Sequence, residues 1–299
     1  MDAVTPAEAG AEVPDRPEPV GPAAPVVAPR SRAGRNLPAA IAVGVVLGGG
    51  IILALATVRF VFVGIVAAAV AVATWEIAGA MRRGGSIGVA LPPLLVGGQA
   101  MMWLAWPYGL DGVLVSFALT VLACLLWRFR GGANGYVRDV TASLFVAAYL
   151  PLFAAFAVLL VVPSDGAGRV LVFMIAVVGS DIGGYAAGVF LGRHPMAPTI
   201  SPKKSWEGFA GSMAAGIVGA VATVVLALDG QPLAGVAIGA AVVLTATLGD
   251  LAESLVKRDL GLKDMGTILP GHGGLMDRLD SLLPSAVVTW CLLSLLVPA

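Results

Sequence analysis

Apolar runs long enough to cross a membrane dominate the sequence after Leu37 and limit what it can fold into. A transmembrane helix needs about 20 mainly apolar residues. Nine runs approach or exceed that length, at residues 37–58, 60–81, 86–106, 110–127, 140–163, 169–192, 207–228, 233–249 and 283–298. Charged residues make up only 12% of the chain, whereas a soluble domain carries about 25%. The sequence therefore predicts an all-α, polytopic integral membrane protein with about nine transmembrane helices.

Composition divides the chain into three regions. Residues 1–36 are rich in Pro, Ala, Glu and Val and show no apolar period, so we predict a disordered tail there. Residues 37–167 hold the N-terminal transmembrane helices, and residues 168–299 hold the remaining helices and the densest polar segments. A cleaved signal peptide is the alternative for the N-terminus, but its polar portion would be very long and a second apolar run follows almost at once. We therefore expect an uncleaved membrane anchor.

The positions of lysine and arginine between the apolar runs predict the orientation of the protein. Cytoplasmic loops of membrane proteins carry an excess of these residues. With the N-terminus in the cytoplasm, the loops on that side contain Arg82, Arg83, Arg128, Arg130, Arg138, Arg193, Lys203, Lys204, Lys257, Arg258, Lys263 and Arg278. We predict a multi-pass protein of the inner (plasma) membrane whose polar active-site cleft faces the cytoplasm. The formal net charge is zero, and no basic patch with interleaved aromatic residues is present, so we expect no nucleic-acid partner.

The densest polar segment is residues 249–281, which contains ten of the 36 Asp, Glu, Lys and Arg residues of the chain. Asp250, Glu253 and Lys257 share one helical face. Asp277 and Asp280 repeat the spacing after a glycine-rich bend. Carboxylates from two helix ends could meet around one hard cation, and Mg²⁺ characteristically uses one or two carboxylates together with substrate phosphates. The alternative is a solvated connector whose charges pair along the helix. In the bend, His272 has a supporting role, as a donor to phosphate, an acid/base or a cap of the turn.

Two further polar features lie in the C-terminal region. Lys203 and Lys204 belong to the segment SPKKSWEG, residues 201–208, which is either an ordinary positive-inside loop or a phosphate-binding segment. Asp181 lies inside an apolar run, where a carboxylate costs at least ~2.5 kcal/mol and usually marks a functional site. The alternative for Asp181 is a buried hydrogen bond between helices. We expect Glu76, near the end of the second run, to pair with the nearby arginines 82 and 83 or to reach the interface.

These segments together resemble the signature of the phosphatidate cytidylyltransferases, also called CDP-diacylglycerol synthases. The matching residues are Ser254, Lys257, Arg258, Lys263, Asp264, Gly271, His272, Gly273, Gly274, Asp277, Arg278 and Asp280. SDIGGYAAG (180–188) and SPKKSWEG also resemble family blocks, although Ile182 and Ser205 stand where threonine is more usual. The resemblance covers about residues 38–299 and is strongest after Ser180.

The resemblance implies an enzyme that joins CTP and phosphatidic acid to give CDP-diacylglycerol and pyrophosphate in the lipid bilayer. On this hypothesis the catalytic residues are Asp250, Lys257, Asp277 and Asp280. The metal ligands are Asp250, Glu253, Asp277 and Asp280, with Mg²⁺ as cofactor and room for a second cation. The substrate-binding residues are Asp181, Ser201, Lys203, Lys204, Arg258, Lys263, His272 and Arg278. A homodimer remains open.

Other readings of the same features remain. A different CTP-dependent lipid or polyprenol kinase or transferase would use similar phosphate-binding residues. An ion-coupled transporter is the alternative from another class, with Asp181 as the coupling residue. Against a transporter, the charge is concentrated in the predicted cytoplasmic segments, and no internal repeat is evident. The CDP-alcohol phosphotransferases are disfavoured because their D-G-x-x-A-R motif is absent.

Overall fold

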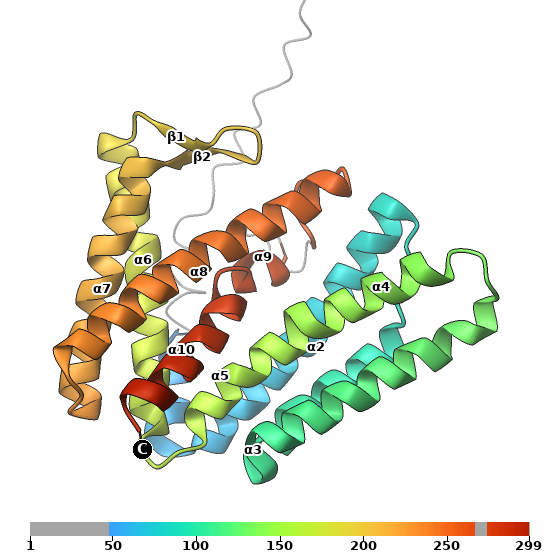
Figure 1. Cartoon of the computed structure of the whole chain (residues 1–299), viewed down its shortest axis with the longest axis horizontal. Helices are drawn as coiled ribbons and strands as arrows, with labels where there is room; N and C mark the ends of the chain where they lie inside the picture. The colour runs from blue at the N-terminus through green and yellow to red at the C-terminus, as the bar shows by residue number, and fades with distance from the viewer. Residues whose placement is uncertain (1–47, 267–273, 299) are drawn as a thin grey trace, which may run out of the picture. The chain divides into compact units, whose positions relative to one another are not determined.

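The computed structural model describes residues 48–266 and 274–298. All of them belong to the second of two units into which the chain divides, Arg35–Ala299. Within the described residues, seven helices are long and apolar enough to cross a membrane. The predicted all-α, multi-pass architecture is therefore confirmed (Figure 1).

The helices up to α6 follow one another with short connections. In chain order they are a short apolar helix Gly48–Thr57, α2 (Arg59–Gly85), α3 (Leu91–Arg128), η1 (Phe129–Gly131), α4 (Tyr136–Ala147), η2 (Ala148–Leu152), α5 (Phe153–Val161), α6 (Gly166–Leu191), α7 (Trp206–Leu228), α8 (Pro232–Asp259), α9 (Met276–Leu279) and α10 (Leu282–Leu296). The π-helical segment η2 joins α4 and α5 into one apolar stretch. Likewise, α9 and α10 together form the last apolar helix.

Helix α3 is two helices that fold back on each other at Gly109. Gly109 has φ 55° and ψ −139°, a conformation that glycine adopts without steric cost. A Cβ atom on Gly97 would collide with the side chain of Thr120, which places the two halves of α3 side by side (Figure 1). The predicted spans 86–106 and 110–127 correspond to these halves. The total of nine crossings stays a prediction, because residues 37–47 of the first apolar run lie outside the described residues.

A short β-hairpin interrupts the helices between α6 and α7. Strand β1 (Pro195–Ala197) pairs antiparallel with β2 (Ser201–Ser205). The sequence predicted only a polar loop here, because five residues that include a proline and two lysines lack the alternation of a strand. The hydroxyl of Ser205 accepts a hydrogen bond from the N–H of Gly208 at 3.1 Å and so caps the N-terminus of α7. The hairpin therefore ends where α7 begins.

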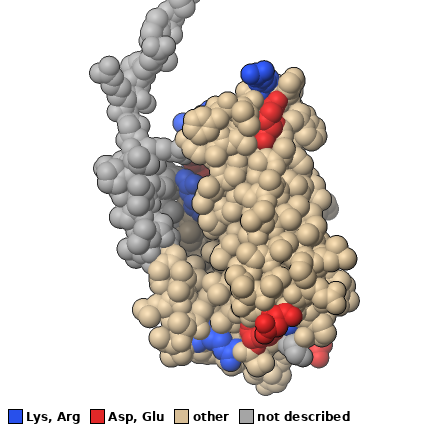
Figure 2. All heavy atoms as spheres, turned by 90° about the vertical axis from the view of Figure 1, so that its left-hand side faces the viewer, with Lys and Arg blue, Asp and Glu red and all other residues tan. Residues whose placement is uncertain are grey.

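Helices α6 and α7 pack closely and present an apolar face. A Cβ atom on Gly183 would lie 2.5 Å from the backbone oxygen of Gly211, the kind of approach that small residues permit. In α7 the first turn carries the acidic residue Glu207, and the rest of the helix is uncharged. Figure 2 shows charged side chains near the two ends of this side of the molecule and a broad band without them between. That distribution is typical of membrane-crossing helices.

Candidate active site

The site is built where α8 meets the chain around α9. Gly249 of α8 lies against the backbone oxygen of Asp280, and a Cβ atom at Gly249 would also lie 2.7 Å from Cγ of Pro284. This contact brings the carboxylates of α8 toward those of α9 and the residue that follows it. Asp280 accordingly interacts electrostatically with Asp250 and Glu253. Two segments that are nearly 30 residues apart in sequence thus contribute acidic side chains to one region.

Lys257 bridges the two groups of carboxylates. Its Nζ lies 2.6 Å from Oε2 of Glu253, one helical turn earlier, and 2.8 Å from Oδ1 of Asp277. The other oxygen of Asp277 accepts hydrogen bonds from the backbone N–H groups of Met265 at 3.1 Å and Gly274 at 2.9 Å. Asp277 is therefore fixed by three donors, and α8 is tied to α9 through one ammonium group.

The region carries more negative charge than its lysines neutralise. Glu253 is 1% exposed and Asp280 is 9% exposed. Oε1 of Glu253 has no hydrogen-bond partner among the described residues. A buried carboxylate oxygen without a partner is costly, and it is also a free ligand for a cation.

The acidic side chains at this junction match the predicted metal in ligand type but not in grouping. Within residues 48–266 and 274–298, no three His, Cys, Asp or Glu side chains are already grouped to hold a metal ion. Instead, Lys257 bridges Glu253 and Asp277, and Lys204 pairs with Asp250. The donors are nevertheless all carboxylate oxygens, the ligand class of Mg²⁺. These carboxylates outnumber the two lysines that pair with them, and Oε1 of Glu253 has no hydrogen-bond partner in the described part of the chain, which fits a hard cation.

The β-hairpin supplies the second lysine. Nζ of Lys204 lies 2.6 Å from Oδ2 of Asp250, so β2 reaches the start of the charged part of α8. Lys203 is exposed on the same strand, and its ammonium makes no ion pair with the described residues. Arg258, predicted to bind substrate, donates from Nε to the backbone oxygen of Ile200 at 2.7 Å. Arg258 thus also ties the end of α8 to the hairpin.

The remaining predicted residues fall into three groups. Asp181 of α6 interacts electrostatically with Asp250, Lys204 and Arg278, which places it at the same site. Ser201 is half-buried at the start of β2, and Lys263 is exposed beyond the end of α8. His272 lies outside the described residues.

The prediction for Glu76 was wrong. Glu76 is 2% exposed, and it forms no ion pair with Arg82 or Arg83 within the described part of the chain. Its Oε2 accepts a hydrogen bond from the backbone N–H of Met276 at 2.9 Å, while Nη2 of Arg83 donates to the backbone oxygen of Met265 at 3.0 Å. Tertiary contact with α9, which sequence spacing cannot reveal, holds this carboxylate. The sequence did contain one signal of this buried contact: Glu76 lies nine residues before the end of an apolar helix, which is too deep in the helix for an ordinary surface carboxylate.

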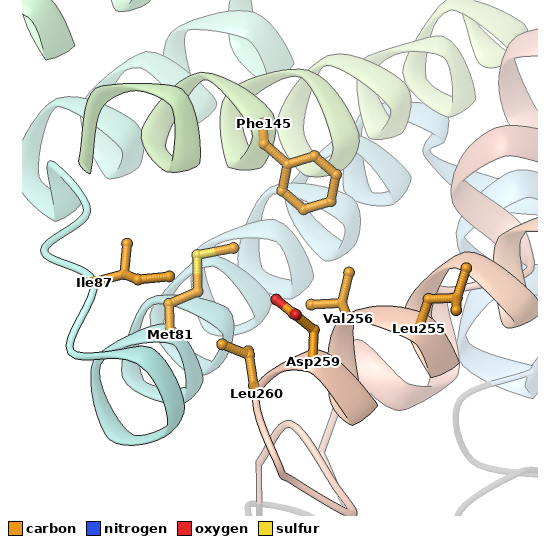
Figure 3. A pocket seen from close by; sticks show the side chains of 7 residues that line it. All are labelled: Met81, Ile87, Phe145, Leu255, Val256, Asp259 and Leu260. Atoms are coloured by element: carbon orange, nitrogen blue, oxygen red, sulfur yellow. The ribbon is translucent and has the colours of Figure 1, made fainter. Parts of the chain in front are cut away.

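A separate hollow lies near the C-terminal end of α8. It is lined by Met81, Ile87, Phe145, Leu255, Val256, Asp259 and Leu260, which come from α2, the α2–α3 linker, α4 and α8 (Figure 3). The lining is apolar except for Asp259. None of the predicted site residues lines this hollow, so it is distinct from the region of carboxylates and lysines.

Comparison with known proteins agrees with the motifs. The model of the cytidylyltransferase family matches residues 38–296. A phosphatidate cytidylyltransferase of Mycobacterium leprae is 50% identical over 281 residues, covering 89% of this chain and 90% of the relative. One of Mycobacterium bovis is 51% identical over 279 residues, covering 89% and 91%. One of Brucella suis is 44% identical over 123 residues, covering 40% of this chain and 45% of the relative. The resemblance drawn from the motifs is confirmed.

Proposed function

Because the chain belongs to the cytidylyltransferase family, we propose that it transfers a cytidylyl group from CTP to phosphatidic acid at the junction of α8 and α9. The products are CDP-diacylglycerol and pyrophosphate, which makes the protein an enzyme of phospholipid biosynthesis. Relatives with the name phosphatidate cytidylyltransferase, half identical along about nine-tenths of both chains, support this substrate pair. One observation carries the location of the site: Lys257 joins carboxylates of α8 and α9 where acidic side chains outnumber the lysines that pair with them.

The reaction determines what the protein must supply. An oxygen of the phosphatidate phosphate forms a bond to the α-phosphorus of CTP. The bond from that phosphorus to the bridging oxygen breaks, and pyrophosphate leaves with the electron pair. A phosphate monoester is already largely ionised near neutral pH, since its second pKa is about 6. No strong general base is needed, and the task is to bring two polyanions together and neutralise the developing charge.

The carboxylates at the site are suited to hold cations. Asp250, Glu253, Asp277 and Asp280 would hold Mg²⁺, and a second cation would draw on the same oxygens. When bound, Mg²⁺ supplies neutralisation of the phosphate charge. Glu253 contributes Oε1, which lacks a hydrogen-bond partner among residues 48–266 and 274–298. Asp277 is oriented in advance by its backbone hydrogen bonds.

Basic residues from α8, from the chain that follows it, from α9 and from the hairpin bind the phosphates. Lys257 serves as counter-ion of Glu253 and Asp277 in the free protein, and with CTP bound it donates to triphosphate oxygens. The other residues that bind triphosphate are Arg258, Lys263 and Arg278, and His272 has a supporting role in substrate binding. Lys203, Lys204 and Ser201 of the hairpin bind the phosphate of phosphatidic acid, and Asp181 lines the path of its headgroup. The acyl chains remain in the bilayer between apolar helices.

The orientation follows from the distribution of basic residues. We infer nine crossings of the plasma membrane, with the N-terminus and the site in the cytoplasm, where CTP is present. Support comes from the lysines and arginines of the predicted cytoplasmic loops. The fold-back of α3 at Gly109 also supports this count, because it supplies two crossings from one helical segment.

Labelled CTP tests the proposal. Purified protein is incubated with phosphatidic acid, Mg²⁺ and CTP labelled at either the α- or the γ-phosphate, and the lipid phase is counted. We expect α-label in lipid only when phosphatidic acid is present, and γ-label only in released pyrophosphate. Entry of γ-label into lipid would identify a kinase instead. Solute flux into liposomes without CTP would identify a transporter.

A further inference from the structure

Glu76 is a buried carboxylate that the reaction outlined above does not use. It lies on α2, far in sequence from the motifs, and is 2% exposed. Among the described residues it has no basic partner, and its Oε1 has no hydrogen-bond partner. A buried carboxylate of this kind is costly. An apolar side chain of similar size would fill the same space more favourably, so packing alone does not account for Glu76.

The carboxylate contacts both backbone segments that lead toward α9. Oε2 accepts the N–H of Met276, the first residue of α9, at 2.9 Å. A Cβ atom at Gly266 would collide with Oε1, and one at Gly274 would lie 2.8 Å from Oε2. At Gly266 the Glu76 carboxylate occupies the place of a Cβ atom, whereas at Gly274 the atom nearest to such a Cβ is the backbone nitrogen of Gly266 at 2.7 Å. The two glycines thus allow the Glu76 carboxylate and these two backbone segments to approach one another closely. Met265 and Met276, which lie beside this contact, are fully buried, so the contact is shielded from solvent.

Asp277 binds the same two backbone segments, around Met265 and around Gly274. A Cβ atom at Gly274 would lie 2.9 Å from Oδ2 of Asp277, and that oxygen accepts the N–H groups of Met265 and Gly274. Two carboxylates, one from α2 and one from α9, thus hold one stretch of chain between them. The remaining oxygen of Asp277 faces Lys257 at 2.8 Å. A shift of Met276 would be passed directly to the next residue, Asp277.

We propose that Glu76 is a positioning residue for the reaction: by binding Met276 it sets the position of Asp277 relative to Lys257. Its contribution comes through the hydrogen bond and the close approach to Gly266 and Gly274. The inference rests on the proposed roles of Asp277 in holding Mg²⁺ and of Lys257 in binding the triphosphate of CTP. It adds α2, in the N-terminal region, to the elements that determine CTP binding.

Steady-state kinetics on purified variants test this role. Misplacing catalytic groups by about 1 Å can cost about 100-fold in rate, so Glu76→Ala is expected to lower kcat/KM for CTP by about 10- to 100-fold, through a higher KM for CTP together with a lower kcat. KM for phosphatidic acid should stay within about twofold of the unsubstituted protein, since the hairpin lysines are untouched. Glu76→Gln keeps an acceptor of the same length and should restore KM for CTP to within about threefold. Should Glu76→Ala not fold, Glu76→Asp replaces it, because its shorter side chain cannot reach Met276.

Thr74→Val is the matched control. Thr74 is fully buried on the same helix, and its hydroxyl donates only to the backbone oxygen of Val70, one turn earlier. This variant should leave both KM values unchanged even if it lowers the yield of folded protein. If Glu76→Ala behaves like Thr74→Val, or raises both KM values equally, the positioning role is overturned.

A double-mutant cycle separates this inference from the proposed function. If Glu76 acts through Asp277, adding Glu76→Ala to Asp277→Asn should cause no further loss. Additive losses would overturn the inference. An inactive Asp277→Asn beside a Glu76→Ala variant with unchanged KM for CTP would refute the positioning role alone. An Asp277→Asn variant with normal turnover would refute the proposed function at Asp277, and the inference with it.

Discussion

Two clusters of buried charge in this protein differ in how completely they are satisfied. At the start of α4, Asp139 is 4% exposed. One of its oxygens accepts from the backbone of Gly88 and from Nε of Arg138, and the other accepts from Nε of Arg128 at 2.9 Å. At the junction of α8 and α9, acidic groups outnumber the lysines that pair with them, and Oε1 of Glu253 has no partner among the described residues.

The difference separates a structural cluster from a candidate binding site. A buried carboxylate whose two oxygens both accept hydrogen bonds from fixed donors, two of them arginines, has little capacity left for a ligand, and removing one partner chiefly costs stability. A cluster with surplus negative charge and an unused oxygen is incomplete until a cation or another donor arrives. Asp139 therefore holds the connection between α2 and α3 to α4, whereas the α8–α9 carboxylates keep an unused oxygen that the proposed cation site would employ.

The largest effect is expected for Asp277→Asn. The substitution keeps the size of the side chain but removes the charge that faces Lys257. Loss of one electrostatic contributor at an active site typically costs about 10²- to 10³-fold in turnover. The measurement is transfer of α-label from CTP to lipid by protein that elutes as a single folded species. Turnover near that of the unsubstituted protein would place the site elsewhere.

An intermediate effect should distinguish the two adjacent hairpin lysines. Lys204 pairs with Asp250 at 2.6 Å, while Lys203 is exposed. Lys204→Ala should raise KM for phosphatidic acid by about tenfold, the scale of one charge-assisted hydrogen bond. Lys203→Ala should raise it by about threefold or less, since exposed charges contribute little. Equal effects of the two substitutions would show that the hairpin acts only as a diffuse positive surface.

The smallest effect on activity is expected for Asp139→Asn, which tests the structural side of the comparison. Weakening the contacts to Arg128 and Arg138 should lower the free energy of unfolding by about 1–3 kcal/mol. Activity per folded molecule should remain unchanged, because this cluster holds no substrate. The measurements are thermal unfolding in detergent and turnover normalised to folded protein. A fall in turnover per folded molecule without any loss of thermal stability would contradict the division into two kinds of cluster.

The sequence predicted the helical architecture because apolar run length is a local property. Both halves of α3 were predicted as separate spans, since the break at Gly109 lies between two apolar runs. The spacing of Asp250, Glu253 and Lys257 also placed them correctly on one helix, α8. The β-hairpin was not predicted, because the five residues of β2, SPKKS, show no alternation of apolar and polar side chains.

Partner identity was harder to predict than residue location. The helical periodicity shows that Glu253 and Lys257 can meet, as they do at 2.6 Å. Helical periodicity gives no information on the contact of Lys204 with Asp250 or on that of Glu76 with Met276. The paired residues are 46 and 200 positions apart in the sequence, respectively. Such contacts arise only when helices pack. The role of Glu76 in particular requires knowledge of which backbone lies against α2.

Binding of Mn²⁺, a spectroscopic substitute for Mg²⁺, tests the central claim most directly. Electron paramagnetic resonance would count the Mn²⁺ bound to purified protein in the presence of CTP. The α8–α9 carboxylates predict bound Mn²⁺ that is lost in Asp277→Asn and Asp280→Asn but retained in Asp139→Asn. Undiminished Mn²⁺ and CTP binding in both site variants would contradict the assignment of these carboxylates as the cation-binding centre.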